Sequence, residues 1–213
     1  MKRVAIAILM IFSFSFALSL DDVKKSLKSS CINEDSLEMK FKTTITSLAM
    51  GSQTVESYSV RKGANKVYFE MKSSLMNQRM ILSGDRIKII DLKTSEERVI
   101  KNTPNMQRLM QPPTVNPMEK GNWAEPVFVT DNLYRIEGDS ATVYYDNAKK
   151  KIVKMEQVTE NANLLTTFDY DPSTKQLLSM KISIMIGAQE TKVEIFISKY
   201  KKSKDFPDRY FNF

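Results

Sequence analysis

The segment KVYFEM, residues 66–71, alternates apolar and polar side chains with a period of two. Val67, Phe69 and Met71 occupy one set of positions, and polar or amphipathic side chains fill the other. The same alternation occurs upstream in LEMKFK, residues 37–42. This period is typical of a β-strand with one buried and one solvated face. The first half of the chain is therefore predicted to form half-buried strands.

Further strands are predicted along the rest of the chain. Alternating or apolar runs lie at 127–129, 133–136, 141–145, 152–158, 164–170, 177–186 and 192–198, separated by turn residues such as Asp146-Asn147, Asp171-Pro172-Ser173 and Gly187-Ala188. No helical segment intervenes, which argues against parallel βαβ units. An antiparallel meander that curls into a sandwich or an open barrel is expected.

Two segments interrupt this pattern. Residues 20–30 have apolar side chains at helical spacing and acidic residues at the start, so a short amphipathic helix is expected there. Residues 102–123 contain four prolines and a short apolar helix candidate at 106–110. Long irregular segments in a compact domain are often functional, and this one is interpreted as a lid.

The N-terminus has the features of a secretory signal peptide. Lys2 and Arg3 precede an apolar run that ends at Leu18 and is too short to span a bilayer. Small residues at Ala17 and Ser19 predict cleavage after Ser19, with an uncleaved anchor as the alternative. Cleavage would remove two cations and lower the formal charge from +7 to +5.

The composition excludes several classes of function. The chain has no histidine, and its single cysteine, Cys31, cannot form an internal disulfide. Histidine-based triads and common zinc sites are therefore excluded, and the scattered lysines do not indicate a nucleic-acid partner. A hydrolase using two carboxylates stays open as a minor alternative. The 13 methionines favour an adaptable apolar surface for an acyl chain, although methionine also fills ordinary cores.

Three segments resemble the outer-membrane lipoprotein-sorting family, the LolA/LolB-like periplasmic lipoprotein carriers. They are YSVRKGANKVYFEM at 58–71, MILSGDRIKIID at 80–91 and FPDRYF at 206–211. The first is similar to the family's strand pair with a basic residue, here Arg61, at the end of one strand. The second resembles the next hairpin, and the third the closing segment. Together with the first helix and the later meander, the resemblance covers nearly the whole chain.

The resemblance implies a single α+β domain over residues 20–213. It would be an incomplete antiparallel β-barrel, a curved half-barrel sheet with short helices covering its concave face. The implied function is a monomeric periplasmic carrier, not an enzyme, that needs no cofactor or metal. It would bind acyl chains of lipoproteins and move them from an inner-membrane release complex to an outer-membrane acceptor. A non-transporting envelope sensor of the same fold is the alternative.

One apolar face of each strand is expected to line the cavity. The cavity candidates are Phe41, Val60, Phe69, Met71, Leu82, Ile87 and Ile89, and the lid candidates are Met106, Leu109 and Met110. By resemblance, Arg61 is the gating basic residue that holds the inner helices closed until cargo arrives. The choice of face depends on register, because a slip of one residue exchanges the two faces of a strand.

Overall fold

The computed structural model describes residues 18–30, 36–63, 65–103, 116–119, 121–202 and 206–213. These ranges contain one α-helix, thirteen strands and two 3₁₀ helices. The helices are α2 (Leu20–Ser30), η1 (Pro117–Glu119) and η2 (Asp208–Phe211); the strands are β1 (Ser36–Ser47), β2 (Gly51–Lys62), β3 (Lys66–Lys72), β4 (Asn77–Ser83), β5 (Arg86–Asp91), β6 (Glu97–Lys101), β7 (Val127–Thr130), β8 (Leu133–Glu137), β9 (Ala141–Asp146), β10 (Lys151–Val158), β11 (Asn163–Tyr170), β12 (Leu177–Ile186) and β13 (Gln189–Lys202).

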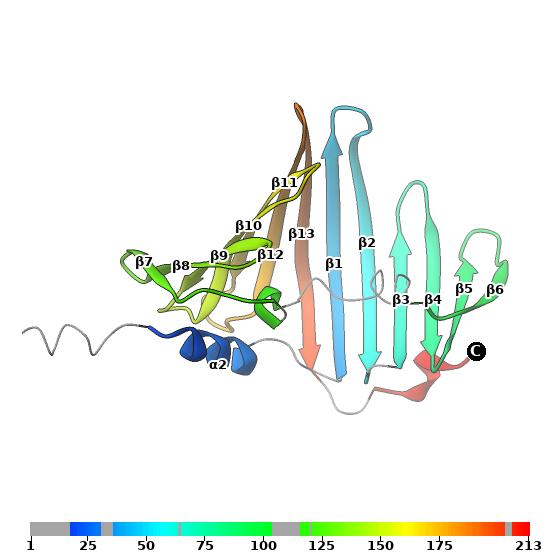
Figure 1. The fold of residues 1–213 in the computed structure, drawn as a ribbon. Coiled ribbons are helices and arrows are strands. Elements are labelled where there is room, and N and C mark those ends of the chain that lie inside the picture. The colour runs from blue at the N-terminus through cyan, green and yellow to red at the C-terminus, as the bar shows by residue number, and fades with distance from the viewer. Residues whose placement is uncertain (1–17, 31–35, 64, 104–115, 120, 203–205) are drawn as a thin grey trace, which may run out of the picture.

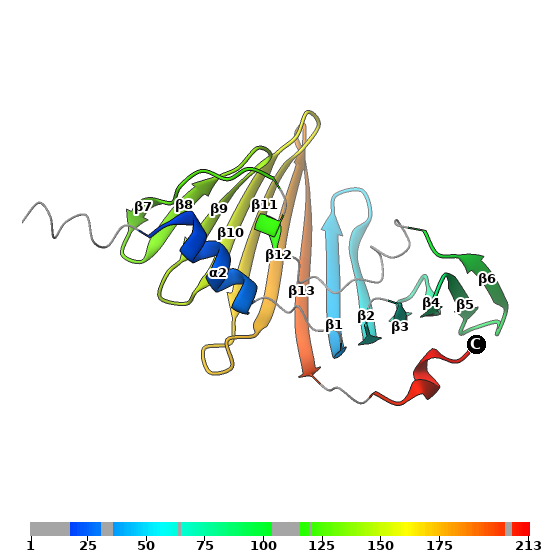
Figure 2. The ribbon, with the colours of Figure 1, turned by 60° about the horizontal axis from the view of Figure 1, so that its bottom comes forward.

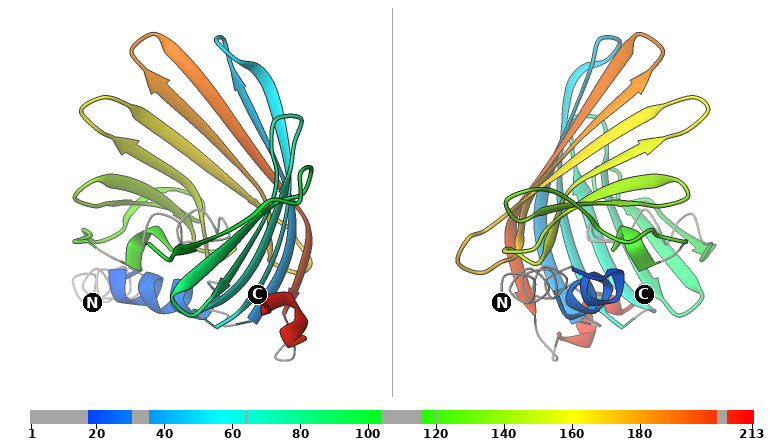
Figure 3. Two further views of the ribbon diagram at one scale, coloured as in Figure 1. Left: turned by 90° about the vertical axis from the view of Figure 1, so that its right-hand side faces the viewer. Right: turned by 60° about the vertical axis from the view of Figure 1, so that its left-hand side comes forward.

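All thirteen strands form one antiparallel sheet, in the order β6-β5-β4-β3-β2-β1-β13-β12-β11-β10-β9-β8-β7. Consecutive strands are neighbours from β1 to β6 and from β7 to β13, and β1 pairs with β13 at the centre. The sheet bends strongly and its edges, β6 and β7, do not pair (Figures 1 and 3). The predicted α+β half-barrel is confirmed, and the sandwich alternative is wrong because the strands build a single sheet.

Side-chain chemistry explains the hairpin turns. Three turns begin with an aspartate whose Oδ1 accepts the backbone amides two and three residues ahead, and each has a positive φ four residues after the aspartate. Such aspartates supply the hydrogen bonds that a tight turn needs. The pairs are Asp91 with Ser95, Asp146 with Lys150 and Asp171 with Lys175. These local turns fix the registers of long neighbouring strands.

The helix α2 lies across the concave side of the strands β8 to β10 (Figure 2). Its first turn has a reciprocal cap, in which the Asp22 amide donates to the Ser19 hydroxyl and that hydroxyl donates to the Asp22 carboxylate. The Leu20 amide also donates to Glu125, 2.9 Å away. The predicted helix over 20–30 is confirmed. No described helix has the length and apolar character needed to cross a membrane.

Candidate functional site

Most of the cavity residues proposed from the sequence lie on the concave face of the sheet. Because side chains alternate along each strand and directly paired residues share a face, the register assigns every strand position to one of the two faces. The assignment is consistent across the sheet, since buried apolar side chains from distant strands gather on the concave face in two clusters.

The first apolar cluster draws its buried members from β1, β3 to β5, β12 and β13. Its central members are fully or almost fully buried, with Met39, Leu82 and Ile87 at 0% exposure. Phe41 and Phe69 stack at a centroid distance of 6.3 Å. The buried members are Leu37, Met39, Phe41, Val67, Phe69, Met80, Leu82, Ile87, Ile89, Leu177 and Ile197.

The second apolar cluster lies beneath α2 and η1, on the half formed by β8 to β10. Val23 and Leu27 of α2 and Met118 of η1 pack on Ile136, Val143, Tyr145 and Ile152. The Tyr145 hydroxyl donates to the Ser26 hydroxyl at 3.0 Å, so the buried ring keeps a polar partner. Short helical elements therefore cover this half, as expected for a half-barrel. Phe168 on β11 packs against both clusters and joins them.

A band of half-buried apolar side chains continues from these clusters along the long central strands. On β1, β13 and β12 the concave positions pair in rows, such as Ile45 with Val193 and Val193 with Ile182. These side chains are neither fully buried nor fully exposed. They form an apolar surface that a flexible alkyl chain could cover, because burying each methylene stabilises binding by roughly 0.8 kcal/mol.

The concave face is nearly free of charge. In the described strands the register places four charged side chains on it: Arg61, Asp91, Arg98 and Lys202. All belong to positions near strand ends or to the edge strand β6, and Asp91 is engaged in its own turn. Within the described ranges, no group of histidine, cysteine or acidic side chains converges in a way that could hold a metal ion. This arrangement suits apolar binding.

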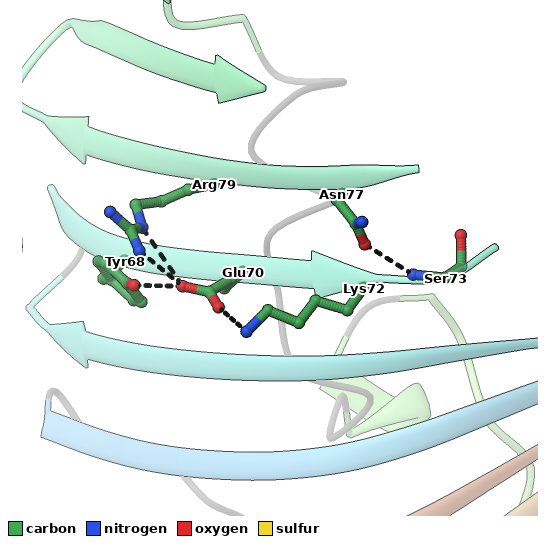
Figure 4. A network of polar contacts seen from close by, with 6 residues as sticks. All are labelled: Tyr68, Glu70, Lys72, Ser73, Asn77 and Arg79. Atoms are coloured by element: carbon green, nitrogen blue, oxygen red, sulfur yellow. Dashed lines mark hydrogen bonds and ion pairs between the residues drawn. The ribbon is translucent and has the colours of Figure 1, made fainter. Parts of the chain in front are cut away.

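The convex face has the opposite character, and Glu70 is the centre of a polar cluster on it (Figure 4). Its carboxylate accepts a hydrogen bond from the Tyr68 hydroxyl and lies 3.2 Å from the Arg79 guanidinium and 2.8 Å from the Lys72 ammonium. Burial alone would raise the pKa of Glu70, but its donors, Lys72 first, outweigh burial and lower the pKa. Burial and the bond to Glu70 raise the pKa of Tyr68 to about 12.

The C-terminal segment packs on the convex face beside this polar cluster and contacts Tyr68. Phe206 and Phe211 pack on Val60, and the Tyr210 ring lies 5.3 Å from that of Tyr68. Asp208 in η2 forms ion pairs with Lys62 at 3.2 Å and Lys66 at 3.1 Å, so the segment is held at the turn between β2 and β3. The convex face beside the β2–β3 turn is thus occupied by the chain itself.

The structure brings six of the seven predicted cavity residues together. Phe41, Phe69, Leu82, Ile87 and Ile89 belong to the first apolar cluster, and Met71 packs against it. Val60 is corrected, because it points to the convex face and packs under Phe206 and Phe211. Val60 and Arg61 are adjacent in β2, so both could not face the concave side.

Arg61 is on the concave face, where it pairs in register with Leu37 on one side and Val67 on the other. It lies at the end of β2, as the resemblance implied. Its gating role stays a prediction. The lid candidates Met106, Leu109 and Met110, and Cys31, lie outside the described residues.

Several concave-face residues were missed by the sequence reasoning. Val143, Tyr145 and Phe168 belong to runs that were recognised as strands, but no face was assigned to them. Their period of two, together with a register anchored at the turn aspartates, could have identified them. The role of β13 as the partner of β1 had no local signal, since the paired residues are far apart in the chain.

Comparisons with known proteins agree with this architecture. No protein-family model and no curated protein sequence matches the chain. Solved structures do: the LolA superfamily protein NE2245 from Nitrosomonas europaea superposes with a TM-score of 0.63 at 10% identity, covering 92% of this chain and 98% of that one. A DUF1329 family protein from Desulfovibrio piger gives 0.56 at 9% identity, with 90% and 95% covered.

A third similar structure is a domain from Vibrio parahaemolyticus, provisionally described as an outer membrane lipoprotein-sorting protein. Its TM-score is 0.54 at 9% identity, and it covers 90% of this chain and 95% of that one. At such low identity the likeness concerns the fold. The chain therefore has the fold of a LolA superfamily protein over nearly its whole length.

Proposed function

We propose that this protein is a periplasmic carrier that binds acyl chains on its concave face and moves lipoproteins from the inner to the outer membrane. The observation that supports this most strongly is the contrast between the two faces of one sheet. The concave face carries apolar side chains from β1, β3 to β5 and β8 to β13, whereas the convex face carries clustered charges and the C-terminal segment.

Physical chemistry connects this face to acyl chains. An alkyl chain offers no hydrogen bonds, so its binding depends on replacing water at an extensive apolar surface. Methionine side chains such as Met39, Met71, Met80 and Met180 can repack around chains of different length, because they are unbranched and polarizable. A curved sheet also surrounds a chain on more than one side, which buries more of it than a flat sheet would.

The fold shared with the LolA superfamily protein and with the lipoprotein-sorting domain supports the same proposal. In this proposal residues 1–19 are removed on export, the mature protein acts as a monomer, and Arg61 controls access to the concave face. The transported lipoprotein is received from a release complex in the inner membrane and passed to an acceptor in the outer membrane. The chain supplies no catalytic step.

The first test is chemical. The purified protein is extracted with organic solvent, and the extract is analysed by mass spectrometry for acyl lipids and lipopeptides. Near-stoichiometric acyl material is expected. Protein that is free of acyl material and also fails to bind a fluorescent fatty acid would contradict the proposal.

The second test separates a carrier from an envelope sensor. If the protein is a carrier, newly made lipoproteins should accumulate in the inner membrane of cells depleted of it, as followed by pulse-chase labelling. A sensor should instead leave lipoprotein location unchanged and co-purify with one stable membrane partner. Unchanged lipoprotein location in depleted cells would overturn the transport step while leaving acyl binding intact.

A further inference from the structure

The two ends of the sheet differ in the chemistry of their turns. At the end that is uppermost in Figure 1, the β1–β2 and β3–β4 turns and the ends of β10 and β12 expose large apolar side chains, and three of them, Leu48, Leu75 and Val158, are exposed by 91%, 80% and 74%. These are the most exposed large apolar side chains among the described residues. The full set at this end is Leu48, Met50, Leu75, Met76, Val158 and Ile186.

The opposite end shows less of this among its described turns, where the exposed large apolar side chains are those of β7, Val127, Phe128 and Val129, ahead of the turn at 131–132. The turns after β4, β9 and β11 contain no large apolar side chain; their sequences are SGD at 83–85, DNAKK at 146–150 and DPSTK at 171–175. Exposed apolar side chains are normal when scattered singly, but a concentration at one end marks a surface that meets an apolar environment.

Two of the apolar tips lie side by side at the centre of the sheet. They close the hairpins β1–β2 and β12–β13, whose strands of 10 to 14 residues are the longest central ones. Because β1 pairs with β13 up to Ser47 and Thr191, the two hairpins are adjacent in the sheet, with Leu48 and Met50 on one tip and Ile186 on the other. We call these the central tips: residues 47–51 and 186–189.

The central tips carry no charge. Their sequences are SLAMG and IGAQ, so entering the boundary of a bilayer would not require a charged group to leave water. Leucine, methionine and isoleucine supply the apolar contact. Two narrow protrusions of this kind fit between lipid headgroups. An interface with a protein partner usually has a continuous patch with aromatic anchor residues instead.

An apolar track leads from the central tips to the first apolar cluster. Behind the tips, Ile45, Val193 and Ile182 form one cross-strand row on the concave face. The next row is Thr43, Ile195 and Met180, and Met180 pairs with Phe168 of the cluster. An acyl chain that moved along these rows would stay on apolar or hydroxyl-bearing side chains throughout.

From these observations we infer that the central tips dock on the surface of a lipid bilayer, and that acyl chains pass between the bilayer and the concave face along the track. The passage rests on the proposed function, whereas the docking can be tested by itself. Since the tips are uncharged, docking requires neither anionic lipid nor low salt.

Docking is measured by flotation with phosphatidylcholine vesicles. The full protein should float with the vesicles, and raising the salt to about 0.5 M should change the bound fraction little. The double variant L48D/M50D should lower the vesicle partition coefficient by at least about tenfold, because exposed apolar groups are replaced by charges that must remain in water. V99D is the matched control: Val99 is 54% exposed, lies on the edge strand β6 and is no part of the tips.

The inference is overturned if the protein does not float, if it floats only with anionic vesicles, or if L48D/M50D floats as well as V99D. Equal thermal unfolding midpoints for the variants, expected because the substituted residues are exposed, would show that folding is not the cause.

Passage is measured with one fluorescent acyl lipid delivered in two ways, from vesicles and from dilute solution. L48D/M50D should slow uptake from vesicles about tenfold and leave binding from solution unchanged. If neither the wild type nor the variants bind the lipid from solution, the proposed function fails. If all bind from solution and take it up from vesicles equally fast, the proposed function stands and the docking inference fails.

Discussion

Adjacent residues on β13 offer a test of which face binds acyl chains. Ile195 faces the concave side, pairs with Thr43 and Met180, and packs against the first apolar cluster. Phe196 faces the convex side and is 50% exposed. Each is replaced by aspartate, so the two variants introduce the same charge one residue apart on the same strand.

The expected loss of affinity in I195D follows from the size of the isoleucine contact. In I195D, about three methylenes of an alkyl chain that covers position 195 would face a hydrated carboxylate instead of the isoleucine side chain. The binding free energy would be weaker by ~2.4 kcal/mol, at ~0.8 kcal/mol for each methylene. That difference corresponds to a dissociation constant about 50-fold higher. Any desolvation of the carboxylate adds to the loss. F196D should keep its affinity within about threefold, since Lys42 is its cross-strand neighbour on the solvated face and accommodates the charge.

The assay is displacement of a fluorescent fatty acid, with circular dichroism and urea unfolding to confirm that both variants fold. Equal losses in the two variants, or a larger loss in F196D, would refute the assignment of the acyl site to the concave face. If I195D binds with wild-type affinity, the central strands are not part of the acyl site.

The remaining predictions concern stability. L82A should lower the free energy of unfolding by about 2–5 kcal/mol in urea titration, because Leu82 is fully buried in the first apolar cluster and truncation leaves a void; a loss below about 1 kcal/mol would contradict that packing. At Gly138, a Cβ atom would lie 2.6 Å from Cε3 of Trp123, so G138A should lower the unfolding midpoint and shift the emission of this single tryptophan, and an unchanged spectrum would contradict the close contact. The pKa of Tyr68 is raised from 10.0 to about 12, so its stabilising contribution is complete below pH 10 and is lost as the pH rises through 12; Y68F should flatten the alkaline decline in unfolding free energy between these values. The pKa of Glu70 is lowered from 4.5, so its contribution is present above that pH and is lost as the pH falls through the folded value, and E70Q should flatten the acid limb of the same curve.

Local patterns predicted most of the secondary structure. The alternation of residues 66–71, the helix over 20–30 and the run of hairpins after residue 127 were all identified correctly, because side-chain period and turn chemistry act between near neighbours in the chain. The same period placed Phe41, Phe69, Leu82, Ile87 and Ile89 on one face. It failed at Val60, since choosing both Val60 and its neighbour Arg61 violated the alternation.

Sequence alone therefore determined the strand and turn pattern, the half-barrel expected by resemblance, and most of the apolar set on the first half of the sheet. Only the tertiary structure decided that β1 joins β13, that α2 packs on β8 to β10 in particular and that Phe206 and Phe211 pack on Val60 at the convex face. The physical reason is that these contacts join segments more than a hundred residues apart. The apolar side chains of a segment indicate that its surface must be buried, but they do not indicate which distant segment packs against it.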